Sequence, residues 1–258
     1  MADWNPALYR RFEDERTRPA AELLARVALE APRNVFDLGC GPGNSTQLLV
    51  ERFPEATVVG TDNSPAMIAA ARERLPRVRF ELSDIEDWQP KEAPDLIYAN
   101  AALQWIPNHE ELLPRLFATL APGGVLAVQM PDNLDEPSHR LMSETAADPR
   151  FADAIGEAYK LRARILAAER YYDLLAPQAE AVDVWRTTYH HRMTAPADIV
   201  QWLRSTGLKP FVEALPQALQ PQYLAEYERR IALAYPERAD GCRLLAFPRL
   251  FIVARRKS

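Results

Sequence analysis

A short apolar run that ends in three closely spaced glycines constrains the fold of this chain more than any other feature. The run 34–38 is typical of a buried strand, Gly39, Gly41 and Gly43 follow within five residues, and a helical pattern extends over 44–53. Three of the nine glycines fall in this turn. A turn built this way needs backbone freedom, or it admits a ligand closer than a Cβ would permit. The amides of the following helix would favour negative charge on that ligand.

A strand, glycine turn and helix in this order can bind more than one class of ligand. A dinucleotide fingerprint has the spacing G-x-G-x-x-G and binds a pyrophosphate. Here the spacing is Gly39-x-Gly41-x-Gly43, with Asp37 directly before it. This spacing disfavours a nucleotide-binding oxidoreductase. An ordinary glycine-rich turn that binds no ligand remains an alternative.

Apolar strand patterns alternate with helical patterns from residue 34 onwards, which predicts a mostly parallel sheet covered by helices on both faces. The fold class is therefore α/β, a doubly wound, Rossmann-like sheet of seven strands with helical cap insertions. The expected strands are 34–38, 57–61, 78–82, 95–98, 125–130, 182–189 and 244–254, and the expected helices include 44–53, 65–74, 110–120, 199–205 and 221–235, with an earlier helix starting at Pro19. Pro248 predicts a bulge or an edge position for the last strand.

The pattern divides the chain into two parts. Residues 1–130 would hold the first strands, the glycine turn and an N-terminal helical segment. Residues 131–258 would add the remaining strands and two helical insertions, at about 131–180 and 190–240, which form a cap. We expect the cap to determine which substrate binds, because ligands bind at the carboxyl ends of the strands in such sheets.

Composition excludes several classes of protein. The 258 residues are 48% hydrophobic and 26% charged, as expected for a globular protein, and the net charge of −5 does not favour nucleic-acid binding. No apolar stretch approaches the roughly 20 residues of a membrane span. The N-terminus lacks the pattern of a signal peptide, and two cysteines are too few for a disulfide framework, so a cytoplasmic location is expected. The sequence does not indicate an oligomeric state.

Polar residues follow several of the expected strands. Asp62 lies 19 residues after Gly43, an offset that favours a carboxylate binding ribose hydroxyls over the alternative of a cap for the next helix. Asp84 and the Ile85 amide follow the third strand and could form hydrogen bonds with the edge of an adenine ring. Asn100 ends the fourth strand, near the expected switch point of the sheet. Because parallel strands end at one edge, these groups could converge on one ligand.

The motifs in this order resemble class I S-adenosylmethionine (AdoMet) methyltransferases. The resemblance covers roughly residues 30–130 and is carried by Asp-Leu-Gly-Cys-Gly-Pro-Gly, Gly-Thr-Asp-Asn-Ser-Pro-Ala-Met, Ser-Asp-Ile and Ala-Pro-Gly-Gly-Val-Leu. It implies AdoMet as cofactor. The cofactor-binding residues that it implies are Asp37, Gly39, Gly41, Gly43, Asp62, Asn63, Met67, Asp84, Ile85, Asn100 and Arg18.

A second set of motifs is similar to a narrower family, the trans-aconitate 2-methyltransferases. These motifs run nearly end to end and include Ala99-Asn-Ala-Ala-Leu-Gln-Trp105, Val128-Gln-Met-Pro-Asp-Asn133 and Leu245-Ala-Phe-Pro-Arg-Leu-Phe-Ile-Val-Ala-Arg255. The resemblance implies methylation of a carboxylate of trans-aconitate, a small polycarboxylate, to a monomethyl ester.

A carboxylate acceptor would need no general base, because carboxyl pKa values near 4 leave the nucleophile ionised at neutral pH. We therefore expect no catalytic acid or base and no metal site, and catalysis by proximity and orientation. The candidate substrate-binding residues are Trp4, Tyr9, Arg16, Gln104, Trp105, Tyr172, Tyr189, His190 and Arg249. Adjacent His190 and His191 are equally explained by a strand that buries one and exposes the other. Methylation of a phenol or an amine, and a non-catalytic AdoMet-binding protein, remain alternatives.

Overall fold

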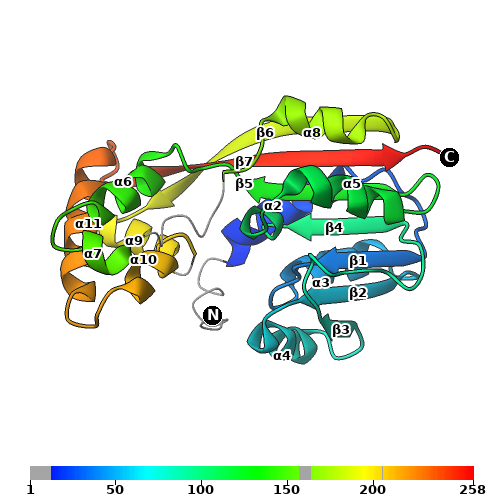
Figure 1. Ribbon diagram of the computed structural model, residues 1–258, viewed down its shortest axis with the longest axis horizontal. Coiled ribbons are helices and arrows are strands. Elements are labelled where there is room, and N and C mark those ends of the chain that lie inside the picture. The colour runs from blue at the N-terminus through cyan, green and yellow to red at the C-terminus, as the bar shows by residue number, and fades with distance from the viewer. Residues whose placement is uncertain (1–12, 157–163, 205) are drawn as a thin grey trace. The chain divides into compact units, whose positions relative to one another are not determined.

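The computed structural model describes residues 13–156, 164–204 and 206–258, and it confirms the predicted α/β class (Figure 1). The described residues form one seven-stranded sheet in the order β3-β2-β1-β4-β5-β7-β6. Its strands are β1 (Asn34–Leu38), β2 (Thr57–Asp62), β3 (Arg79–Leu82), β4 (Leu96–Asn100), β5 (Val125–Pro131), β6 (Ala179–Met193) and β7 (Arg243–Arg256).

Strands β1 to β5 form a parallel core. The pairs β1–β2, β1–β4, β2–β3 and β4–β5 are all parallel. The chain order along the sheet reverses between β1 and β4, which is the switch point where open α/β sheets bind ligands. Strand β7 is antiparallel to β5, because Arg256 at its end donates to the carbonyl of Gly124, just before β5.

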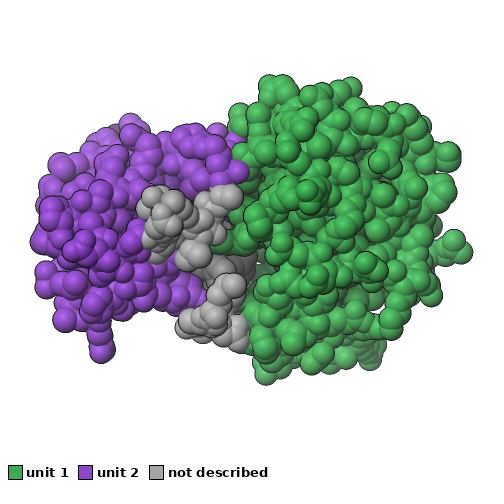
Figure 2. Space-filling view, viewed as in Figure 1, with its two compact units in different colours: residues 1–131, 165–187, 250–258 green, residues 132–164, 188–249 purple. Residues whose placement is uncertain are grey.

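The helices that belong with these strands are α2 (Glu13–Ala25), α3 (Asn44–Arg52), α4 (Pro65–Arg74), the 3₁₀ turn η1 (Leu103–Trp105), α5 (His109–Thr119), α6 (Pro137–Ala146), α7 (Ala152–Ile155), α8 (Ala168–Leu175), α9 (Pro196–Arg204), α10 (Lys209–Ala214) and α11 (Gln220–Ala234). The chain forms two compact units, coloured separately in Figure 2. Unit 1 comprises 1–131, 165–187 and 250–258, and unit 2 comprises 132–164 and 188–249.

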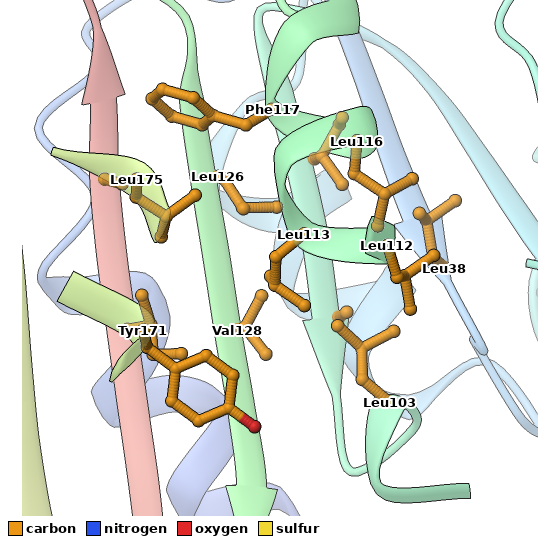
Figure 3. Packing of buried hydrophobic residues seen from close by; sticks show 14 of the residues in the cluster. Leu38, Leu103, Leu112, Leu113, Leu116, Phe117, Leu126, Val128, Tyr171 and Leu175 are labelled. Carbon is orange, nitrogen blue, oxygen red and sulfur yellow. The ribbon is translucent and has the colours of Figure 1, made fainter. Parts of the chain in front are cut away.

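Helices cover both faces of the sheet in unit 1, as β4 illustrates. Successive residues of a strand point to opposite faces. Ile97 and Ala99 belong to an apolar cluster with helix α5, whose Leu113 and Leu116 face the sheet in Figure 3. Tyr98 points to the other face, where its hydroxyl donates to the Ala20 carbonyl of α2 at 2.5 Å. The sheet is therefore wound on both sides, as predicted.

Unit 2 is held together by tyrosines of α11. The hydroxyl of Tyr223 donates to the Met142 carbonyl at 3.0 Å, and that of Tyr227 donates to the Ser138 carbonyl at 2.6 Å. Both rings are fully buried and both bonds end on α6. These hydrogen bonds connect α6 to α11, and α9 packs against α11 in the same core.

The expected helix start at Pro19 and the edge position considered for Pro248 are both wrong. Helix α2 (Glu13–Ala25) runs through Pro19 rather than starting there. Pro248 lies in β7, which is an interior strand between β5 and β6 and not an edge. Its carbonyl accepts a hydrogen bond from Asp132, one residue beyond the end of β5, so the missing N–H falls at the last rung of the ladder, where its loss costs least.

Strand β6 is also longer than the expected 182–189. No helix among residues 13–156, 164–204 and 206–258 is long and apolar enough to cross a membrane.

Candidate functional site

The three glycines form the turn between β1 and α3, and each has a positive φ: 72° at Gly39, 54° at Gly41 and 90° at Gly43. Side chains rarely tolerate these angles, so the turn depends on glycine. It is tied to β2, because the amides of Gly39 and Cys40 both donate to the Thr61 carbonyl, at 2.8 and 2.9 Å. The predicted strand, glycine turn and helix are confirmed.

Gly39 and Gly41 have different surroundings. A Cβ on Gly39 would lie 2.3 Å from the Cβ of Ala102 and 3.6 Å from Cδ1 of Ile85, so the loops that follow β1, β3 and β4 meet here. A Cβ on Gly41 would meet no atom of the described residues within 4 Å. The turn is therefore crowded at its start and open beside Gly41.

Asp62 links this open part of the turn to the end of β2. Its Oδ2 accepts from the amide of Gly41 and its Oδ1 from the amide of Ser64, both at 2.9 Å. The N-cap of α4 is Ser64, whose hydroxyl accepts from the Met67 amide, so the interpretation of Asp62 as the helix cap is wrong. A carboxylate offers about four lone pairs, so these two bonds are compatible with ribose hydroxyls as additional donors.

The loop after β3 is fastened to the loop after β2. Asn63 donates from Nδ2 to Oδ2 of Asp84 at 3.2 Å, and the amide of Glu86 donates to Oδ1 at 3.0 Å. The amide of Ser83 donates to the Asp62 carbonyl at 3.0 Å. Asp62, Asn63, Asp84 and Ile85 are thus brought to one edge of the sheet, as the sequence predicts.

Asp37 lies at the base of the turn and is fully buried. Its Oδ2 accepts from the hydroxyls of Ser45 and Thr46 at 2.7 and 2.6 Å, whereas its Oδ1 is buried with no hydrogen bond partner among the described residues. Burial raises the pKa of Asp37 from 3.8 to about 6, against the two hydroxyls, which lower it; the charge of Asp62 adds a smaller rise. A cation placed beside Oδ1 would stabilise the ionised form.

The loop after β4 carries two further unsatisfied acceptors. Oδ1 of Asn100 and Oε1 of Gln104 are buried without a hydrogen bond partner in the described part of the chain. Gln104 is held by a bond from its Nε2 to the Ala101 carbonyl at 2.7 Å, and Ala101 has a φ of 55°. Unsatisfied buried groups and strained backbone concentrate at functional sites.

A buried histidine, absent from the predicted site, supports this loop. His109 Nε2 lies 2.8 Å from the Leu103 carbonyl of η1, so it must donate there. Nδ1 is then an acceptor for the Tyr171 hydroxyl at 2.6 Å, and that oxygen in turn accepts from the Leu166 amide at 3.1 Å. Burial lowers the pKa of His109, against the Leu103 carbonyl, which raises it. The neutral imidazole therefore joins η1 to α8, and only the tertiary structure reveals this.

Other predicted residues have simpler surroundings. The side chain of Arg18 is 69% exposed and donates to Glu22 at 2.8 Å on α2, and Met67 is buried in α4. Trp4, Tyr9 and the side chain of Arg16 lie outside the described residues.

The remaining candidates for substrate binding belong to both units. In unit 1, Gln104 is buried, Trp105 is partly buried and Tyr172 is 51% exposed. In unit 2, Tyr189, His191 and Arg249 are buried whereas His190 is exposed, so the alternation expected for the histidine pair is confirmed. No group of three or more His, Cys, Asp and Glu that could hold a metal ion occurs among the residues described.

The comparison with known sequences matches residues 9–211 to a family described as "Methyltransferase domain". The chain is 68% identical to a protein of Variovorax paradoxus and 65% identical to one of Paracidovorax citrulli, each over the whole of both chains. A protein of Yersinia pestis is 56% identical over 98% of both. All three relatives are named trans-aconitate 2-methyltransferase.

Among solved structures, the YcgJ protein of Bacillus subtilis superposes with a TM-score of 0.61 over 93% of this chain and 99% of its own, at 13% identity. A phosphoethanolamine N-methyltransferase of Haemonchus contortus, in complex with S-adenosylhomocysteine, superposes with a TM-score of 0.55 over 93% of this chain and 53% of its own, at 17% identity. At these identities the likeness concerns the fold.

Proposed function

The chain belongs to the methyltransferase domain family, and from that premise we propose that it transfers the methyl group of AdoMet to a carboxylate of trans-aconitate, giving a monomethyl ester. The observation that carries the proposal is the end-to-end similarity, up to 68% identity, to relatives that bear the name trans-aconitate 2-methyltransferase. The relatives match both units, so the similarity includes the parts of the chain outside the parallel core.

The residues at the strand ends fit AdoMet. The space beside Gly41 admits a ligand next to the backbone, and the Asp62 carboxylate suits ribose hydroxyls. Buried oxygens of Asp37 and Asn100, which have no partner among the described residues, suit the positive charge of the ligand. Arg18 has a weaker claim, because it is exposed and bonded to Glu22.

AdoMet supplies a methyl group on a positively charged sulfur. The acceptor carboxylate is already ionised at neutral pH. Transfer forms an O–CH₃ bond and breaks the S–CH₃ bond, so one negative and one positive charge disappear together and no proton has to move. The protein has to hold the carboxylate oxygen in line with the methyl group and exclude water, which is catalysis by proximity and orientation. Among the described residues, Gln104, Trp105, Tyr189, His190, Arg249 and Tyr172 are our candidates for binding the acceptor.

The test is methyl transfer from labelled AdoMet to a panel of trans-aconitate, cis-aconitate, citrate, isocitrate and a phenol. A base-labile product formed chiefly with trans-aconitate supports the proposal. Labelled phenol ether, or AdoMet binding with no acid methylated, contradicts it.

A further inference from the structure

Arg115 of helix α5 holds the turn that follows β3, and all of its partners belong to unit 1. Its Nη1 donates to the Trp88 carbonyl and its Nη2 donates to the Ile85 carbonyl, both at 2.9 Å. The amide of Trp88 donates to the same Ile85 carbonyl at 3.3 Å, which closes the turn 85–88. One guanidinium therefore bridges both ends of this turn.

This use of an arginine needs an explanation beyond packing. Arg115 is partly buried, and both of its hydrogen bonds end on backbone carbonyls, with no ion pair to a carboxylate in the described part of the chain. Removing a charge from water is costly, and an apolar side chain would fill the same space without that cost. What a guanidinium adds is a rigid set of paired N–H donors that can bind two carbonyls in one fixed geometry. The arrangement therefore fixes the position of the turn.

The turn 85–88 lies at the ligand edge of the sheet. Cδ1 of Ile85 lies 3.6 Å from the position that a Cβ on Gly39 would take, so the turn packs against the first glycine. The Ser83 amide donates to the carbonyl of Asp62 at 3.0 Å. Asp62 is the proposed acceptor for the ribose hydroxyls, and the base of a nucleoside is bonded directly to its ribose. The adenine of AdoMet would therefore reach the loop after β3, the neighbour of β2 in the sheet.

Two groups of this loop suit the edge of an adenine ring. The amide of Ile85 donates to no acceptor among the described residues, whereas the next amide, of Glu86, donates to Oδ1 of Asp84 at 3.0 Å. An amide N–H matches a ring nitrogen of adenine, and a carboxylate oxygen of Asp84 matches the exocyclic amino group. Both groups lie in a loop, so their directions depend on what holds that loop.

We infer that Arg115 is a positioning residue for adenine recognition. It holds the turn 85–88 so that the Ile85 amide and the Asp84 carboxylate face the base of AdoMet. This inference rests on the proposed function and on the ribose-binding role of Asp62 within it. Arg115 does not touch the cofactor, and it acts through the two carbonyls that it binds.

The experiment is isothermal titration with S-adenosylhomocysteine and S-inosylhomocysteine, which differ only in the base. Hypoxanthine carries an oxygen and an N–H where adenine carries an amino group and a ring acceptor, so it reverses both hydrogen bonds. Wild type should bind the adenosyl ligand at least about tenfold more tightly than the inosyl ligand. Arg115→Met should weaken adenosyl binding about tenfold and reduce the preference to less than about twofold, because the turn is no longer held.

Arg256→Met is the matched control. The guanidinium of Arg256 also binds two backbone carbonyls, those of Ala118, at 2.8 Å, and Leu120 at the end of α5. These carbonyls come shortly before β5, at the amino ends of the parallel strands and away from the ligand edge. Arg256→Met should therefore lower the Tm and leave both affinities as in wild type.

The ratio of the two affinities separates positioning from stability. A purely structural Arg115 would give Arg115→Met a lower Tm with the wild-type preference for the adenosyl ligand, and that result overturns the inference. Arg115→Gln keeps part of the aliphatic stem and offers a single donor nitrogen, so its preference should fall between those of wild type and Arg115→Met. If Arg115→Met does not fold, Arg115→Gln decides, and a wild-type preference in that protein overturns the inference.

The failure of this inference is distinct from that of the proposed function. Wild type that methylates trans-aconitate, with folded Arg115 variants of unchanged preference, removes Arg115 from the cofactor site and leaves the function. Wild type that methylates no acid removes the function, whereas the titrations need no acceptor and still test Arg115. Wild type that binds both ligands equally overturns the inference whatever the acceptor is.

Discussion

Asp37→Asn should change both the stability and the cofactor affinity of the protein, in opposite directions. The carboxylate is fully buried, one of its oxygens has no partner among the described residues, and its pKa is raised from 3.8 to about 6. Because the folded state holds the proton more tightly than the unfolded state, this group contributes stability below pH 3.8 and loses it as pH rises through 6. Above that range the buried charge is a net cost.

The magnitude follows from the size of the shift. A difference of about 2.2 pKa units at 1.36 kcal/mol each makes the ionised Asp37 cost about 3 kcal/mol at neutral pH and above. Between pH 5 and pH 8 the cost grows by about 1 kcal/mol, since at pH 5 the unfolded Asp37 is already ionised whereas the folded one is still mostly protonated. The amide introduced by Asp37→Asn would keep the shape, and its carbonyl can accept from Ser45 and Thr46, but it does not titrate.

The assay is the difference in free energy of unfolding between the two proteins, measured in urea at pH 5, 6, 7 and 8 without AdoMet. All other groups titrate alike in both, so the difference isolates Asp37, and it should move in favour of the variant by about 1 kcal/mol over this range. AdoMet affinity of the wild type should rise as pH passes 6, because a cation favours the ionised carboxylate, and the variant should bind more weakly with no such rise. A difference in unfolding free energy that stays constant with pH would refute the reasoning.

Three further predictions concern the same edge of the sheet. Asp62→Ala should weaken AdoMet binding at least tenfold in calorimetric titration, since it removes the proposed ribose acceptor and releases Gly41; unchanged affinity removes Asp62 from the site. Gly39→Ala should lower stability by about 1–3 kcal/mol in urea unfolding, because its Cβ would lie 2.3 Å from that of Ala102 at a φ of 72°, and wild-type stability would contradict this contact. His109 has a pKa lowered by burial, so the unfolded state binds more protons below about pH 6.5 and stability should fall there; neutral His109→Gln should flatten that fall, and an identical pH profile would contradict the lowered pKa.

The parallel core and its ligand edge were predictable because local patterns determine them. Apolar runs alternating with helical patterns specify parallel strands, and parallel strands bring their carboxyl ends to one edge. Asp62, Asp84 and Asn100 could therefore be placed together before any contact was known. The spacing of the glycines is also a local pattern, and it distinguished this turn from a dinucleotide-binding turn.

Features that depend on tertiary packing could not be predicted. The buried amide of Asn133, which has no hydrogen bond partner in the described part of the chain, is one example, since an asparagine after a strand is ordinarily a turn former. The tautomer of His109 follows from partners on η1 and α8, which no periodicity connects. Pro248 was expected at a bulge or an edge because proline cannot donate to a ladder, yet β7 is interior and tolerates it at the last hydrogen bond of the ladder.

The position of β7 in the sheet has a consequence for how the chain folds during synthesis. The final segment of unit 1 is residues 250–258, and it lies in the interior of the sheet between β5 and β6. Domains that are contiguous in sequence can fold as each emerges from the ribosome. Here β6 cannot join the sheet until β7 has been made, so the sheet closes late and its contacts span long sequence separations, which slows folding. Removing residues from the end of β7 would therefore disrupt its pairing with both β5 and β6.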